Sequence, residues 1–164
     1  MTYRRKNSLR GKGFDFSQPA FYFITISVKD RLKILGEVKD DKVILSEIGK
    51  IVDDIWNTIP DHYLLTKLHA RQVMPDHFHG IIEIIYGNPR HESVSVMVNQ
   101  VKGAVTKQIK LLGLEVQHPI WQRSFHCEAF WMTDDFEKVE KYIIDNPKNY
   151  LKKNANIQNQ GRIH

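Results

Sequence analysis

Two histidines separated by a single residue form the part of this sequence best suited to chemistry. His77 and His79 lie in a segment, residues 74–80, that runs on into a short apolar, β-branched stretch ending at Ile85. Such a stretch is typical of a buried strand. Side chains alternate between the two faces of a strand, so both imidazoles point to one face, about 7 Å apart. They could share a metal ion. Two rings that simply bind backbone carbonyls would give the same pattern.

The strand that carries the histidines needs neighbours, and the sequence offers several. Alternating aromatic and β-branched residues predict a strand at 21–28. A shorter pair is predicted at 32–38 and 42–45, a further strand at 64–73, and another within 119–131.

Three amphipathic helices are predicted between these strands. The first opens at Ser46 as N-cap and ends at Pro60, with apolar residues at helical spacing. The second runs from about Ser93 to Leu112. The third begins near Thr133, with acidic residues in its first turn, and runs to about Asn146, stopping before Pro147. Its buried side is predicted to comprise Phe136, Val139, Ile143 and Ile144.

The order of elements indicates an α+β fold. A mainly antiparallel sheet of four to five strands with helices packed on it fits the spacing, as in a ferredoxin-like sandwich. The length of 164 residues suits a single domain, residues 1–164, with 1–19 a basic N-terminal arm and 148–164 a basic tail.

The composition of the chain bears on its expected cellular location and on whether it has a membrane partner. No apolar run reaches the roughly 18 residues of a membrane span, and the first residues lack the apolar core of a signal peptide. The single cysteine, Cys127, excludes an internal disulfide framework and a multi-cysteine zinc site. We therefore expect a cytoplasmic protein without a membrane partner.

The charge pattern favours a nucleic-acid partner. The net charge is +5, and basic residues gather in the N-terminal arm and on the second predicted helix. A solvated helix face would also carry such lysines. The candidate phosphate contacts are Arg4, Arg5, Lys6, Lys102, Lys107, Lys110 and Arg123.

Two motifs in order, about 65 residues apart, resemble those of the single-tyrosine HUH transposase family, of the small insertion-sequence or REP-associated tyrosine transposase type. Residues 74–82 resemble its histidine-hydrophobic-histidine motif. Residues 142–147 resemble its Tyr-Ile-x-x-Asn-Pro helix end, which carries the nucleophile. Weaker similarities at 4–26, 45–52, 101–107 and 121–125 extend the resemblance over nearly the whole chain.

The resemblance implies a metal-dependent nuclease and strand transferase. Tyr142 would attack single-stranded DNA near a hairpin and form a 5′-phosphotyrosine, while a divalent ion, Mg²⁺ or Mn²⁺, would be held by His77 and His79. Asn146, four residues after the tyrosine, is the candidate third ligand. Relatives often form dimers, so a homodimer is expected.

Some positions depart from the family pattern and keep a second interpretation open. Many relatives have an acid followed by histidine where this chain has Cys127 and Glu128, and a basic residue where it has Trp131. The alternative is a catalytically inactive or domesticated hairpin-binding regulator. A nucleotide hydrolase with a histidine-rich strand fits less well, because Ile81 stands where a further histidine is usual.

Overall fold

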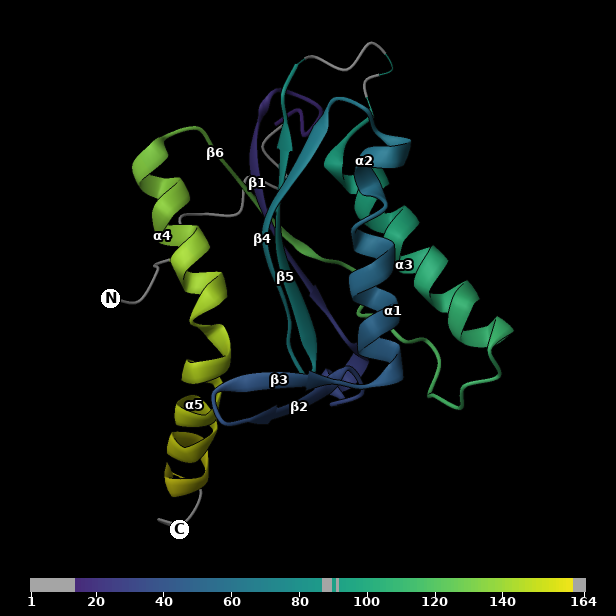
Figure 1. Cartoon of the computed structure of the whole chain (residues 1–164), viewed down its shortest axis with the longest axis vertical. Helices are drawn as coiled ribbons and strands as arrows, with labels where there is room; N and C mark the ends of the chain where they lie inside the picture. The colour runs from purple at the N-terminus through teal and green to yellow at the C-terminus, as the bar shows by residue number, and fades with distance from the viewer. Residues whose placement is uncertain (1–13, 87–89, 91, 161–164) are drawn as a thin grey trace.

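A four-stranded antiparallel sheet organises the fold, which we describe from a computed structural model (Figure 1). The structure describes residues 14–86, 90 and 92–160, with only the backbone for 156–160. The strands are β1 (Ala20–Ser27), β4 (Thr66–Val73), β5 (His77–Ile84) and β6 (His126–Phe130), in the spatial order β4-β5-β1-β6. Every neighbouring pair is antiparallel, so the predicted α+β sandwich with a ferredoxin-like sheet is confirmed. Arg4, Arg5 and Lys6 of the predicted arm lie outside the described residues.

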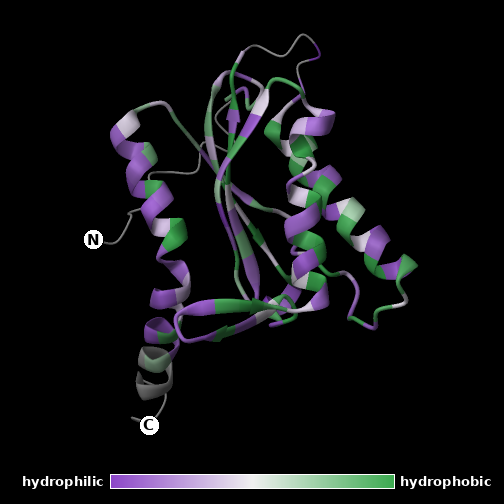
Figure 2. Ribbon diagram, viewed as in Figure 1, coloured by the Kyte–Doolittle hydropathy of each residue, from purple (hydrophilic) through white to green (hydrophobic). Residues whose placement is uncertain are grey.

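The helices form a layer on each side of the sheet. In Figure 1, α1 (Glu47–Trp56), α2 (Ile59–His62) and α3 (Val94–Leu111) lie on one side, and α4 (Thr133–Ile144) lies on the other. The bands of polar and apolar residues along α1 and α3 in Figure 2 mark amphipathic helices. As predicted, the Ser46 side chain caps α1 by accepting from the backbone N–H of Gly49 at 3.1 Å.

The two faces of the sheet bury separate sets of apolar side chains because strand residues alternate. Tyr22, Ile24 and Phe78 belong to the larger cluster, which packs under α1 and α3. Phe23 and Ile81 belong to the smaller one, which packs under α4. His77 and His79 alternate with Phe78 and therefore share the α4 face.

A separate two-stranded hairpin, β2 (Gly36–Lys39) and β3 (Lys42–Leu45), lies across one end of the sheet. Asp40 and Asp41 at its tip have φ of 51° and 59°, as a two-residue hairpin turn requires. The pair was predicted, but its first strand, expected at 32–38, begins only at Gly36, where pairing with β3 starts. Residues 29–31 before it form a short 3₁₀ turn, η1 (Lys29–Arg31).

The ends of two predicted helices were wrong. Pro60 does not end the first helix, because α1 already stops at Trp56 and the proline occupies the first turn of α2. The third helix does not reach Asn146: α4 stops at Ile144, and Asn146 begins a further helix, α5 (Asn146–Gln160). The tail after Lys148, to which no element was assigned, is therefore helical as far as Gln160. Ile144, predicted to be buried, is 62% exposed.

None of the helices in the described part of the chain combines the length and apolar character needed to cross a membrane.

Candidate active site

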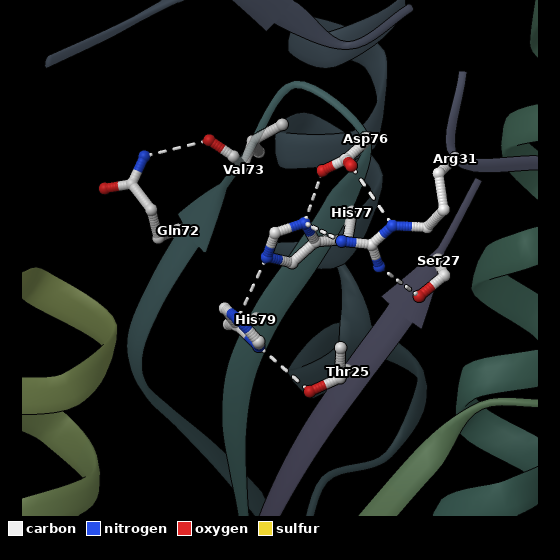
Figure 3. A network of polar contacts seen from close by, with 8 residues as sticks. All are labelled: Thr25, Ser27, Arg31, Gln72, Val73, Asp76, His77 and His79. Carbon is white, nitrogen blue, oxygen red and sulfur yellow. Dashed lines mark hydrogen bonds and ion pairs between the residues drawn. The ribbon is translucent and has the colours of Figure 1, made fainter. Parts of the chain in front are cut away.

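The histidine pair is buried at the start of β5, and the two rings face each other. His77 Nε2 and His79 Nε2 lie 3.0 Å apart, and the side chains come from one strand, two residues apart (Figure 3). The first is 7% exposed and the second 3%. Two nitrogen ligands at right angles, each about 2.1 Å from an ion, would also lie about 3.0 Å apart. The spacing and the donor atoms therefore fit a shared divalent cation.

His77 is oriented by a carboxylate. Its Nδ1 lies 2.6 Å from Asp76 Oδ1. Burial raises the pKa of Asp76, but the hydrogen bond with His77 and the electrostatic attraction of His77 and Arg31 outweigh burial and bring the pKa below its ordinary value. The ionised carboxylate can only accept, so Nδ1 of His77 donates and its Nε2 lone pair is available to a cation.

His79 is oriented from β1. Thr25 is its register partner across the strand pair, and Thr25 Oγ1 lies 2.9 Å from His79 Nδ1. The Phe23 ring stacks on the imidazole with a centroid distance of 5.4 Å. These contacts leave Nε2 of His79 directed at Nε2 of His77.

Tyr142 on α4 is brought to the same place. Its ring centroid lies 5.6 Å from that of His79 and 6.0 Å from that of Phe23, in edge contact with both. The Lys153 ammonium group lies 5.8 Å from the Tyr142 ring centroid. A tyrosine and a histidine pair separated by more than 60 residues in the sequence thus meet within one chain.

Asn146 is buried at the first position of α5, four residues after the tyrosine. Asp145 between the two helices has helical backbone angles, φ −81° and ψ −4°, so the chain turns little between Tyr142 and Asn146. Within the described residues, no three His, Cys, Asp or Glu side chains could hold an ion together. An amide oxygen, a substrate oxygen or water would have to complete the coordination of an ion at His77 and His79.

The three predicted lysine contacts do not lie around this site. Lys102, Lys107 and Lys110 lie on α3, in the helix layer on the other side of the sheet. The Lys102 ammonium group donates to the backbone carbonyl of Gln122 at 2.8 Å. Arg123 is exposed just before β6.

A carboxylate on the histidine face and two positions that depart from the family pattern have structural roles. Glu83 shares the histidine face but pairs with His69, Oε2 to Nε2 at 2.7 Å. Cys127 is buried in the larger cluster, consistent with a packing role. The Trp131 indole N–H donates to the Pro19 carbonyl at 3.1 Å while the residue remains 55% exposed.

Sequence reasoning missed the supporting residues. Asp76, Thr25 and Arg31 all contact the histidines, and none was proposed as a site residue. Asp76 carried a signal, since it directly precedes His77. Thr25 could have been found only from the strand register.

Comparison with known proteins agrees with this geometry. The family model described as "Transposase IS200 like" matches residues 21–146, from β1 through Tyr142 to Asn146. The chain belongs to this family. The resemblance stated from the two motifs is thereby confirmed, and IS200-like transposases act in DNA transposition.

Three proteins similar to this chain share 18–24% sequence identity with it. An uncharacterized protein of Haemophilus influenzae is 24% identical over 160 residues, covering 87% of this chain and 88% of the relative. The structure of a REP-associated tyrosine transposase bound to a REP hairpin matches with a TM-score of 0.62 at 18% identity, covering 92% of this chain and 74% of that one. A crystal structure from Deinococcus radiodurans matches with a TM-score of 0.53 at 19% identity, covering 82% and 94%. Both structures share the fold of this chain.

Proposed function

We propose that this IS200-like transposase nicks and rejoins single-stranded DNA beside a hairpin through a 5′-phosphotyrosine on Tyr142. The observation that carries the proposal is the 5.6 Å between the ring centroids of Tyr142 and His79 in a single chain. A nucleophile and a cation-binding pair so close could act on one phosphate. The same contact supports a site assembled from one chain, and a homodimer stays a prediction.

The reaction needs an activated phenol. A tyrosine hydroxyl has an ordinary pKa near 10, so it must lose its proton as it attacks. The Tyr142 oxygen bonds to phosphorus, the bond from phosphorus to the 3′ oxygen breaks, and that oxygen leaves with a proton as a 3′ hydroxyl. Attack of a 3′ hydroxyl on the phosphotyrosine reverses the step and rejoins a strand without ATP or an added energy source.

His77, His79 and Asn146 would hold a divalent ion, Mg²⁺ or Mn²⁺. A bound ion supplies a positive charge that polarises the phosphate and stabilises the charge that develops on its oxygens. The protein's own part is to aim both Nε2 atoms at one point, through Asp76 behind His77 and Thr25 behind His79. Nitrogen ligands favour Mn²⁺ over Mg²⁺.

The partner we propose is single-stranded DNA that carries a hairpin. A REP hairpin is bound in one structure with this fold, and the net charge of +5 suits a polyanion. Arg4, Arg5, Lys6, Lys102, Lys107, Lys110 and Arg123 remain the candidate phosphate contacts.

The test is formation of a covalent adduct. The protein is incubated with a labelled hairpin oligonucleotide and Mn²⁺, then separated under denaturing conditions. We expect a labelled protein band that disappears in Tyr142→Phe and remains in Tyr86→Phe, which alters an exposed tyrosine just after β5. Tight hairpin binding without an adduct in the unmodified protein would instead indicate a domesticated regulator, the interpretation left open by Cys127, Glu128 and Trp131.

A further inference from the structure

Arg31 is a charged side chain beside the histidine pair to which the proposed reaction gives no part. Its Nε donates to Asp76 Oδ2 at 3.1 Å and its Nη1 to Ser27 Oγ at 3.1 Å. Its Nη2 lies 3.3 Å from His77 Nδ1, so the guanidinium stands beside the imidazole (Figure 3). The side chain is nevertheless 52% exposed. It is therefore fixed in direction and open to a ligand.

Arg31 has more donors than these neighbours can use. A guanidinium carries five N–H bonds. Asp76 Oδ2, Ser27 Oγ and His77 Nδ1 can together occupy at most three of them. At least two N–H bonds of the guanidinium therefore remain without a partner among the described residues. A phosphate oxygen is an acceptor that matches a guanidinium in charge and geometry.

The backbone that carries Arg31 is held in an unfavourable conformation. Asp30 and Arg31 have φ of 56° and 55°, in the left-handed region that residues other than glycine rarely adopt. The turn is closed by the Arg31 N–H donating to the Val28 carbonyl at 3.1 Å. It directs the guanidinium back over the start of β5. Strain of this kind tends to collect at functional sites.

The position of Arg31 selects which phosphate it can reach. The guanidinium lies on the Nδ1 side of the His77 ring, whereas the two Nε2 atoms meet on the opposite side of that ring. The imidazole therefore separates Arg31 from a phosphate bound at the histidine pair. A phosphate that Arg31 binds would therefore be a different one, such as the next phosphate along the strand.

The surface beyond Arg31 has room for the attached nucleotide. A cavity of about 780 Å³ between the β2–β3 hairpin and α5 is lined by Lys33, Pro75 and Tyr150, among others. Pro75 directly precedes Asp76, the carboxylate that Arg31 binds. Lys33 lies two residues after Arg31, with its Nζ 5.9 Å from the Tyr150 ring centroid. A strand leaving the histidine pair past Arg31 would meet a second cation and an aromatic ring.

We infer that Arg31 binds the DNA phosphate next to the cleaved one and so fixes the strand across the histidine pair. The inference rests on the proposed function, because it assumes that the cleaved phosphate lies at His77 and His79.

The test measures binding in a Tyr142→Phe background, where no adduct can form. Hairpin oligonucleotides carry a single uncharged methylphosphonate at the cleaved phosphate or at either neighbour. We expect a methylphosphonate at one of the two neighbouring phosphates to weaken binding about tenfold, the effect of losing a charge-assisted hydrogen bond. In the double variant Tyr142→Phe, Arg31→Gln, the same methylphosphonate should change binding less than about twofold. Arg71→Gln is the control, since Arg71 also pairs with an aspartate, Asp53, but on the opposite face of the sheet.

Two outcomes would overturn the inference. One is that each methylphosphonate, whichever phosphate carries it, weakens binding equally with and without Arg31→Gln. The other is that binding by the Tyr142→Phe protein is insensitive to methylphosphonate at both neighbouring phosphates. This outcome needs no Arg31 variant, so it can be observed even if Arg31→Gln fails to fold. Failure of the proposed function would be seen separately, as absence of the Tyr142 adduct with unmodified protein and DNA.

Discussion

His79 illustrates how the site depends on single residues outside the recognised motifs. Thr25, which is 7% exposed, lies 2.9 Å from its Nδ1 and fixes which ring nitrogen faces His77. A hydroxyl in this position holds the orientation of an imidazole ligand. Cation binding should therefore depend on Thr25, although the threonine would not touch the ion.

We expect Thr25→Val to raise the Mn²⁺ concentration needed for half-maximal adduct formation about tenfold or more, because the valine keeps the shape but removes the hydroxyl. Thr25→Ser retains the hydroxyl and should stay close to the unmodified protein. The measurement is a Mn²⁺ titration of the adduct assay. Equal Mn²⁺ requirements in the two variants would show that the Thr25 hydroxyl does not support His79.

Single residues were predictable where chemistry and spacing coincide. His77, His79 and Tyr142 could be selected from their residue types and the family resemblance, and the structure brings them together. Thr25 and Arg31 could not, because one reaches the site through strand register and the other through a left-handed turn. Neither feature leaves a pattern in a single sequence.

At the scale of elements, β5 is held against α1 at a point where no side chain fits. Gly80 lies directly after His79, and a Cβ added there would come within 2.5 Å of Trp56 Cζ2 and 2.9 Å of Phe78 Cε1. Trp56 is fully buried on α1. The position of the histidine strand therefore depends on the close approach of its backbone to this indole.

Gly80→Ala should lower the free energy of unfolding by about 1–3 kcal/mol, the usual cost of overpacking a core. Gly103→Ala is the matched control: Gly103 lies inside α3 with nothing within 4 Å of the added Cβ, so alanine should stabilise the helix by up to about 1 kcal/mol. Urea unfolding of both variants measures the difference. Equal effects of the two substitutions would mean that Trp56 moves aside without cost.

Most strands and helices could be predicted because they follow simple periodicities, and the exceptions have physical reasons. Pro147 suggested the end of a helix, since the residue before proline disfavours helical angles. A proline is equally suited to the first turn of a new helix, and α5 uses Pro147 in that way. The following residues are too polar to show an amphipathic pattern, so α5 left no recognisable signal.

At the scale of the whole molecule, the site and the predicted lysines occupy different layers. His77, His79 and Tyr142 lie on the α4 side, while Lys107 and Lys110 are exposed on α3 across the sheet. If both regions contact one DNA molecule, the hairpin must extend around an end or edge of the sheet. The charge of α3 would then contribute to affinity without affecting the chemical step.

We expect the double variant Lys107→Gln, Lys110→Gln to reduce the slope of log binding constant against log salt concentration by about 1.4 to 1.8, as two lost phosphate contacts predict. The rate of adduct formation at saturating protein should not change. Lys50→Gln, Lys67→Gln removes the same charge from exposed positions outside the proposed contacts and serves as the control. An identical reduction in both double variants would mean that only overall charge matters.

Successive side chains of the inner strand β1 point to opposite faces of the sheet. Tyr22, Ile24 and Ile26 are buried in the cluster beneath α1 and α3, whereas Phe23 and Thr25 face the histidines. Inserting or deleting one residue here would exchange these two sets, placing a hydroxyl among the aliphatic side chains and a tyrosine or isoleucine against the imidazoles. The alternation along this one strand therefore ties the packing of the core to the placement of the histidine pair, so a change in its length would disturb both at once.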